Sequence, residues 1–219
     1  HIPMESVGCY VPGGKYPLLA SAHMGIVTAK VAGVKRVIAA APPFNGKPAP
    51  AIVVAMDMAG ADEIYCLGGV QAVAAMAIGT ESVAAVDMLV GPGNMFVAEA
   101  KRLLFGQVAV DLLPGPSEVL VLADDTADAR FVAADLLAQA EHGSGHERVW
   151  LVTTLANLLK AVEKEIAKQL PGLARREFIT RALANNGWLI QVNSLADGIA
   201  LTNRLAPEHC EVMTRNADK

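Results

Sequence analysis

The sequence predicts an α/β protein that contains two units, each with a parallel sheet flanked by helices. Three observations lead to this prediction. Short runs rich in Val, Ile and Leu alternate along the chain with longer segments of helical character. The short runs lack the apolar–polar alternation of half-exposed strands, as expected for strands covered on both faces. A turn rich in Pro and Gly at residues 112–116 separates two series of such segments.

The first series defines an expected unit at residues 1–114. Its strands are expected at residues 7–11, 36–40, 63–67, 88–90 and 108–112. Its helices are expected between them, at residues 19–34, 48–60, 70–79 and 95–105. Apolar strands joined by helices are typical of parallel β-α-β connections.

The second series defines an expected unit at residues 115–219. Strands are expected at residues 119–122, 149–153 and 188–192. Helices are expected at residues 127–141, 155–169, 174–185 and 194–205. The same β-α order predicts a second parallel sheet.

The composition excludes several classes of function. The chain is 53% apolar and 18% charged, with a net charge of −4. No apolar run approaches the roughly 20 residues of a membrane-spanning helix, so we expect no membrane partner. The dispersed Lys and Arg residues provide no basic surface for nucleic acid. The chain begins at His1 rather than Met and ends at Lys219, and we interpret it as truncated at both ends.

The cysteine pattern indicates a reducing compartment. Cys9, Cys66 and Cys210 are odd in number and far apart, so they predict neither a disulfide framework nor a thiolate metal site. A cytoplasmic location is therefore expected. Cys66 lies in an apolar run, which predicts that its thiol is buried.

Glycine-rich turns mark the expected ligand-binding edge. Ligands of open parallel sheets gather at the carboxyl ends of the strands, and we place the turns at 12–14, 68–69, 91–94 and 115–117 there. None has the GxGxxG dinucleotide pattern. In GPGN at 91–94, glycines allow close approach of an anion, and Asn94 can donate and accept hydrogen bonds. The alternative is a helix cap without a ligand, and both readings also apply to Gln71.

Two polar pairs in the second half could carry chemistry. Gln139 and His142 are three residues apart at an expected helix end, so they can face one ion or ligand. The alternative is a cap with a surface histidine. Glu208 and His209 follow Pro207 in an expected extended turn, and together they can perform proton transfers near neutral pH. An exposed polar pair in a loop is the alternative there.

Ser117 lies in the sequence GPSE rather than in a G-x-S-x-G motif. A capping or substrate-binding hydroxyl is therefore a better interpretation than a nucleophile.

The ordered set of motifs resembles the histidinol dehydrogenase family over nearly the whole chain. The motifs are YVPGG at 10–14, GGVQ at 68–71, GPGN at 91–94, EAKR at 99–102, GPSE at 115–118, QAEHG at 139–143 and APEH at 206–209. The resemblance implies two incomplete Rossmann-like units in a homodimer that contains zinc and uses NAD. It also implies oxidation of a primary alcohol through an aldehyde to a carboxylate, most typically of L-histidinol to L-histidine.

Family roles can be carried over to matching positions of this sequence. In the first unit, Tyr10, Gln71 and Asn94 match residues that contact the cofactor. In the second unit, two residues match zinc ligands that also hold substrate (Gln139 and His142), one matches a substrate contact (Ser117), and two match the catalytic pair (Glu208 and His209). His209 would accept the hydroxyl proton and contact the substrate, while Glu208 would activate water in the second oxidation.

Two departures from the family leave the substrate open. The remaining zinc ligands, an Asp and a second His, are expected beyond Lys219. After PGG the chain has an unusual segment that includes Lys15 and His23. A cation there would suit a sulfonate, so the alternative is the same chemistry on a sulfonated diol, as in sulfopropanediol 3-dehydrogenase. A non-catalytic nucleotide-binding α/β module is a further alternative, which the presence of both Glu208 and His209 disfavours.

Overall fold

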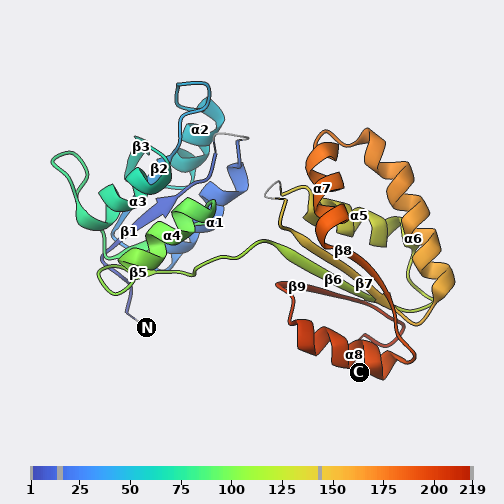
Figure 1. The fold of residues 1–219 in the computed structure, drawn as a ribbon. Helices are drawn as coiled ribbons and strands as arrows, with labels where there is room; N and C mark the ends of the chain where they lie inside the picture. The colour runs from blue at the N-terminus through green and yellow to red at the C-terminus, as the bar shows by residue number, and fades with distance from the viewer. Residues whose placement is uncertain (1, 14–16, 143–144, 218–219) are drawn as a thin grey trace. The chain divides into compact units, whose positions relative to one another are not determined.

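The computed structural model describes residues 2–13, 17–142 and 145–217. The chain divides into two compact units, His1–Pro114 and Gly115–Lys219. Each unit is a parallel sheet flanked by helices (Figure 1), so the predicted α/β class is confirmed. Among the described residues, no helix combines the length and the apolar character that a membrane span needs.

The sheet of unit 1 has the strand order β3-β2-β1-β4-β5, with every pair parallel. This is the Rossmann order without its sixth strand. The strands are β1 (Ser6–Tyr10), β2 (Arg36–Ala41), β3 (Glu63–Cys66), β4 (Met88–Val90) and β5 (Ala109–Val110). The helices are α1 (Leu19–Val31), α2 (Pro50–Met58), α3 (Gly69–Ile78) and α4 (Met95–Leu104).

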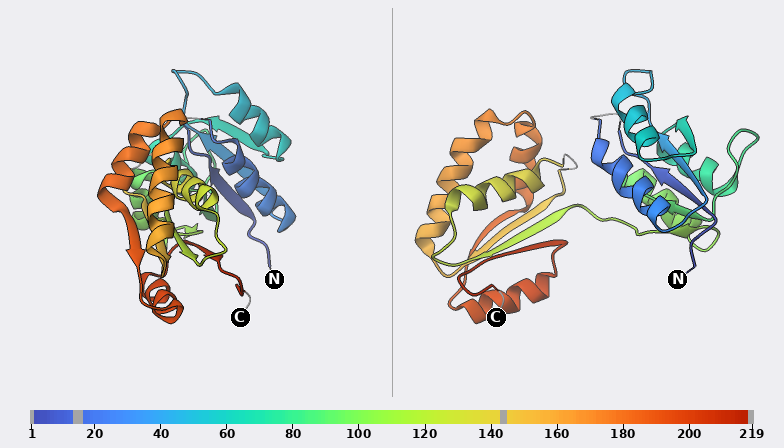
Figure 2. Two further views of the ribbon diagram at one scale, coloured as in Figure 1. Left: turned by 90° about the vertical axis from the view of Figure 1, so that its right-hand side faces the viewer. Right: turned by 180° about the vertical axis from the view of Figure 1, so that it is seen from behind.

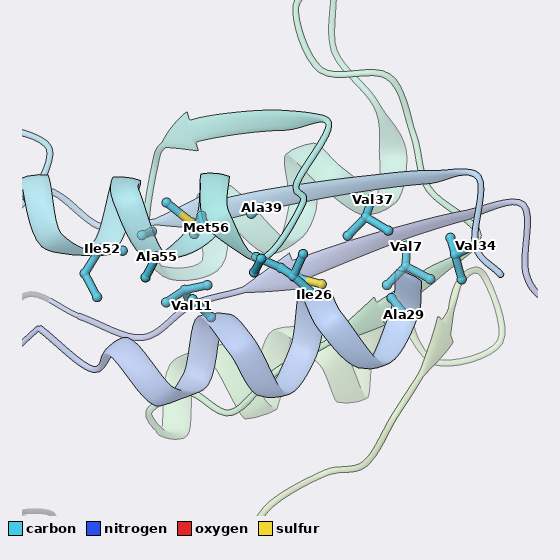
Figure 3. Packing of buried hydrophobic residues seen from close by; sticks show 14 residues of the cluster. Val7, Val11, Ile26, Ala29, Val34, Val37, Ala39, Ile52, Ala55 and Met56 are labelled. Carbon is cyan, nitrogen blue, oxygen red and sulfur yellow. The ribbon is translucent and has the colours of Figure 1, made fainter. Parts of the chain in front are cut away.

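Each face of this sheet is covered by two helices. Helices α1 and α2 pack on the face that carries Val7 and Val37, and Ile26 of α1 lies over this layer (Figure 3). Helices α3 and α4 pack on the opposite face, where Tyr10 and Leu89 are buried. Alternate residues of β1 therefore point to different helix layers.

The sheet of unit 2 has the order β8-β7-β6-β9, again with every pair parallel. Its strands are β6 (Glu118–Ala123), β7 (Arg148–Thr153), β8 (Gly187–Gln191) and β9 (His209–Met213). Its helices are α5 (Ala129–Ala140), α6 (Ala156–Gln169), α7 (Arg176–Asn186) and α8 (Leu195–Leu205), with a short 3-10 turn at Leu170–Gly172. Helices α5, α6 and α7 cover one face and α8 covers the other (Figure 2).

Local sequence explains where several helices begin. Pro50 occupies the first turn of α2, where the absence of its N–H costs nothing. Asn94, Asp128 and Ser194 each accept a hydrogen bond from a backbone N–H in the first turn of the following helix, as polar residues at this position commonly do.

The structure differs from the prediction mainly at the edges of the sheets. The segment 108–112 forms only a two-residue strand, because the Asp111 carboxylate accepts the N–H of Leu112 and interrupts the extended ladder. Strand β9 was not predicted from the sequence. It pairs with β6, with His209 opposite Val119 and Met213 opposite Ala123.

Candidate functional site

The carboxyl edge of the sheet in unit 1 carries the turns with the predicted cofactor residues. Tyr10 is the last residue of β1, Gln71 lies in the first turn of α3, and Asn94 immediately precedes α4. In this unit the glycine-rich turns lie where parallel sheets bind ligands.

Tyr10 fixes the start of α3. Its side chain is only 6% exposed, and its Oη accepts a hydrogen bond from the Gly69 N–H at 3.1 Å. Gln71 is exposed one turn further along the chain. Tyr10 thus positions the turn that carries Gln71. Because its hydroxyl oxygen only accepts in this contact, its O–H can donate a hydrogen bond to another group.

Asn94 is a helix cap. Its Oδ1 accepts hydrogen bonds from the backbone N–H groups of Phe96 and Val97, each at 3.1 Å. The structure therefore shows the helix cap that was one interpretation of this residue. Because the oxygen serves the helix, the amide Nδ2 is the group of Asn94 that can donate to a ligand.

The glycine that opens this turn is required by geometry. Gly91 has a φ of +112°, and a Cβ built on it would lie 2.1 Å from the backbone oxygen of Tyr10. No other residue fits without displacement of the β1 backbone. Tyr10 and the 91–94 turn are consequently in close contact.

The polar residues of unit 2 lie at the opposite end of its sheet, where the strands begin. Ser117 immediately precedes β6, and Glu208 immediately precedes β9. Gln139 lies in the last turn of α5, which runs back toward the strand starts. The prediction that the 115–117 turn lies at the carboxyl ends of strands is wrong, because this turn leads into β6 rather than out of a strand.

A cavity of about 350 Å³ lies at this amino edge. The residues around it come from β6, α5 and the start of β9: Val119, Asp135, Ala138, Gln139, Glu208, His209, Cys210 and Glu211. The structure thus brings three of the predicted site residues, Gln139, Glu208 and His209, to one cavity.

Gln139 has an unsatisfied amide at the cavity. Its Nε2 atom is buried and has no hydrogen-bond partner within the described residues. A buried polar atom without a partner is uncommon in proteins and calls for an explanation. The two ends of a glutamine amide exchange by a simple rotation, so this side chain can present its oxygen to a cation or its N–H₂ to a ligand.

The predicted catalytic pair lies at the start of β9. Glu208 is exposed, and its Oε2 accepts the N–H of Glu118 at 3.3 Å. His209 is the first residue of β9 rather than part of a loop, so the prediction of an extended turn holds only as far as Glu208. Since Met213 packs in the layer beneath α5, strand alternation places His209 and Glu211 on that same face.

Two further carboxyl groups lie at this cavity. The pKa of Glu211 is raised by burial, by the charge of Asp135 and by a hydrogen bond with Asp135, while His209 acts in the opposite direction. Neither residue was identified from the sequence. Two spacings could have indicated them: Asp135 is four residues before Gln139 on α5, and Glu211 is two residues after His209 on β9.

His142 does not line the cavity. It lies beyond the end of α5, its side chain is exposed, and its Nδ1 is 3.0 Å from the backbone oxygen of Gln139. Within the described ranges, no group of three or more His, Cys, Asp or Glu side chains could hold a metal ion. A metal here would need the Gln139 amide, a turn of the His142 ring and further ligands.

Ser117 is half-buried at the start of β6, and its carbonyl accepts the N–H of Arg148 at 3.0 Å. Its position next to Glu118 places it on the same edge as Glu208.

The other residues considered in the sequence are His23, Lys15 and two cysteines. His23 is exposed on α1, and Lys15 lies outside the described residues. The prediction of a buried Cys66 is wrong, because Cys66 is exposed at the end of the edge strand β3. Cys9 is buried, and burial together with the charge of Asp111 raises the pKa of its thiol to about 12.

Comparison with known proteins places these features in context. The sequence profile of the histidinol dehydrogenase family matches residues 1–219. The chain is 56% identical to a "Histidinol dehydrogenase homolog" of Shouchella clausii and 55% identical to a "Histidinol dehydrogenase homolog 1" of Mesorhizobium japonicum, over 99% and 100% of its length. It is 47% identical to a histidinol dehydrogenase of Bacillus cereus over 96% of its length.

A solved structure of the same family has the same fold as this chain. The crystal structure of histidinol dehydrogenase from Elizabethkingia anophelis superposes with a TM-score of 0.94 and 40% sequence identity, over 99% of this chain and 50% of that one. The chain spans about half the length of the relatives it matches, with 51%, 43% and 49% of the three sequences above covered.

Proposed function

Because the chain belongs to the histidinol dehydrogenase family, we propose that the protein oxidises a primary alcohol to a carboxylate in two NAD-dependent steps, with L-histidinol as the substrate. The observation that carries the proposal is the cavity at the start of β9. It joins a carboxylate from Glu208, an imidazole from His209 and the buried amide of Gln139, which has no partner among the described residues.

His209 supplies the base for each oxidation. Its ring accepts the hydroxyl proton as the carbinol carbon loses a hydride, because an imidazole titrates near neutral pH. NAD, when bound, accepts that hydride. The strand backbone around His209 places this side chain on the face toward α5, beside the cavity.

Glu208 supplies the base for hydration. In the second step the aldehyde must gain water before another hydride can leave, and the exposed carboxylate of Glu208 accepts a proton from that water. The N–H of Glu118 holds one of its oxygens and leaves the other free for this task. His209, which is exposed, first releases to water the proton that it took from the alcohol. Its neutral ring then accepts the hydroxyl proton of the aldehyde hydrate as the second hydride leaves.

The donor set fits zinc in part. Gln139 offers a buried amide whose Nε2 has no partner in the part of the chain that the structure describes, and His142 offers an imidazole three residues further on. Zinc, when bound, would hold and orient the substrate hydroxyl and amine. Two ligands are fewer than the four of a closed zinc site, so we propose that other parts of the protein or its partner subunit complete the coordination.

We assign the dinucleotide to the carboxyl edge of unit 1. Tyr10, Gln71 and Asn94 lie on neighbouring turns there, each with a polar group suited to the ribose or amide of the cofactor. The absence of a GxGxxG motif is compatible with this assignment, because the 91–94 turn offers a capped helix N-terminus instead.

A second substrate deserves the same test. The two relatives called homologs are 56% and 55% identical to the chain, against 47% for the Bacillus cereus histidinol dehydrogenase. A sulfonated diol is therefore kept as the alternative substrate beside L-histidinol. Formation of NADH by the full-length, zinc-loaded protein should be followed with L-histidinol and, separately, with 2,3-dihydroxypropane-1-sulfonate.

Each outcome of this assay decides between the alternatives. Saturable turnover of L-histidinol supports the proposed substrate, and turnover of the sulfonate alone replaces it with the diol. Binding of NAD and zinc without turnover of either alcohol would favour a non-catalytic module. Glu163→Gln, an exposed carboxylate on α6, is a matched control for Glu208→Gln and should retain full activity.

A further inference from the structure

An ion pair between a buried lysine and a partly exposed aspartate contacts the 91–94 turn. Lys101 of α4 is only 2% exposed, and its ammonium forms an ion pair with Asp111. Lysine is seldom this deeply buried unless its charge is compensated. Its Nζ also donates a hydrogen bond to the backbone oxygen of Gly91 at 3.0 Å.

Asp111 holds the other side of the same residue. Its Oδ2 accepts the N–H of Gly91 at 2.8 Å, and its Oδ1 accepts the N–H of Leu112 at 2.6 Å. The C=O of Gly91 is therefore bound by the ammonium and its N–H by the carboxylate. Charged partners make these hydrogen bonds stronger than those between neutral groups.

Gly91 has little freedom to move. Its α-carbon lies so close to the Tyr10 carbonyl that an added Cβ would be 2.1 Å from that oxygen. Three residues later the turn ends at Asn94, whose Oδ1 is committed to the cap of α4. The ion pair consequently sets the distance and direction of the turn relative to Tyr10.

We propose that Lys101 and Asp111 are positioning residues for the dinucleotide, which hold the 91–94 turn so that Asn94 and Tyr10 meet the cofactor together. The inference rests on the proposed assignment of NAD to this edge of unit 1. Alternatively, the Lys101–Asp111 ion pair only stabilises the fold. The two roles predict different effects of substitutions on NAD affinity.

The test combines single and double substitutions in the full-length protein. Lys101→Met leaves a carboxylate without its partner and is expected to lower stability as well as NAD affinity. The double variant Lys101→Met/Asp111→Leu leaves neither charge without its partner. Proteins commonly tolerate the replacement of both members of such an ion pair by apolar side chains. Arg102→Met is the matched control, because Arg102 forms an exposed ion pair with Glu99 on the same helix.

For a positioning role, the double variant should unfold at a denaturant concentration close to that of the wild type. Its Kd and KM for NAD should rise about tenfold or more, as expected when hydrogen bonds to charged groups are lost. Its kcat at saturating NAD and its KM for the alcohol should stay within about threefold, since the chemistry lies in unit 2. Arg102→Met should change none of these values.

Three results would overturn the inference. The first is a folded double variant with wild-type affinity for NAD, which would reduce the pair to a structural role. The second is a double variant that fails to fold, because the pair would then hold unit 1 together rather than the turn alone. The third is a wild-type protein that does not bind NAD in equilibrium dialysis. NAD binding without turnover would instead refute the proposed activity and leave the positioning role to be judged by Kd.

Discussion

Replacement of Gly91 by alanine tests the close packing at the carboxyl edge of unit 1. The new Cβ would lie 2.1 Å from the carbonyl oxygen of Tyr10, and the φ of +112° is strained for any residue with a side chain. Backbone strain of this kind costs about 1–3 kcal/mol. Forced displacement of packed atoms adds about 1–3 kcal/mol. We therefore expect Gly91→Ala to lower the free energy of unfolding by about 2–6 kcal/mol.

Gly106→Ala is a matched control in the same unit. Gly106 also has a positive φ, +92°, but a Cβ on it would meet nothing within 4 Å. Its replacement should show the backbone strain alone, about 1–3 kcal/mol. The difference between the two variants isolates the contact with Tyr10.

The assay is urea denaturation of both variants and the wild type, followed by circular dichroism with m-values compared. NAD affinity should be measured beside it, and it should fall for Gly91→Ala and remain unchanged for Gly106→Ala. A Gly91→Ala variant that loses no more stability than Gly106→Ala would refute the reasoning from close contact.

Three further predictions concern the thiols and the cavity of unit 2. A maleimide should label the exposed Cys66 and Cys210 within minutes and Cys9 only after denaturation, because burial raises the pKa of the Cys9 thiol to about 12. Mass spectrometry counts the labels, and rapid labelling at all three positions would contradict the burial of Cys9. Glu211 has a pKa raised from its ordinary value of 4.5, so the folded state binds its proton more tightly and stability is lost as pH rises through the folded pKa. Glu211→Gln should remove this pH-dependent loss of stability. If the variant's denaturation midpoint differs between pH 4.5 and pH 7 as much as the wild type's does, the prediction is contradicted. Gln139→Leu should leave the free energy of unfolding within about 1 kcal/mol of the wild-type value, because its Nε2 has no hydrogen-bond partner among the described residues. The amount of zinc retained after dialysis should nevertheless fall. Unchanged zinc content would remove Gln139 from the metal site.

The strands in the interior of each sheet were predictable because their sequences carry the signal directly. Residues such as Val37, Ile38 and Ala39 are buried on both faces, so their run of apolar residues is continuous and stands out from the helices around it. The start of β6 was predicted within one residue for the same reason.

Strand β9 could not be recognised in this way. Its residues His209, Cys210 and Val212 are exposed, because β9 lies at the edge of its sheet. An exposed strand needs no apolar run, and its pairing with β6 depends on contacts far away in sequence. The sequence therefore showed a reactive pair after a proline and gave no indication that His209 begins a strand.

The candidate site was predictable by residue type more than by geometry. The ordered motifs led to Gln139, Glu208 and His209, which share one cavity. The carboxyl groups of Asp135 and Glu211 were missed because each is unremarkable within its own segment, and only the pairing of α5 with β9 brings them together. Lys101 was part of a motif, yet its burial follows from the fold and from its partner Asp111.

The most direct test of the proposed double oxidation is the amount of NADH that the full-length protein forms for each molecule of alcohol consumed. The wild type should form two NADH and one carboxylate. Glu208→Gln should form the first NADH and stall at the aldehyde, whereas His209→Asn should slow both oxidations. Two NADH at an unchanged rate from both variants would contradict the assignment of this cavity as the active site.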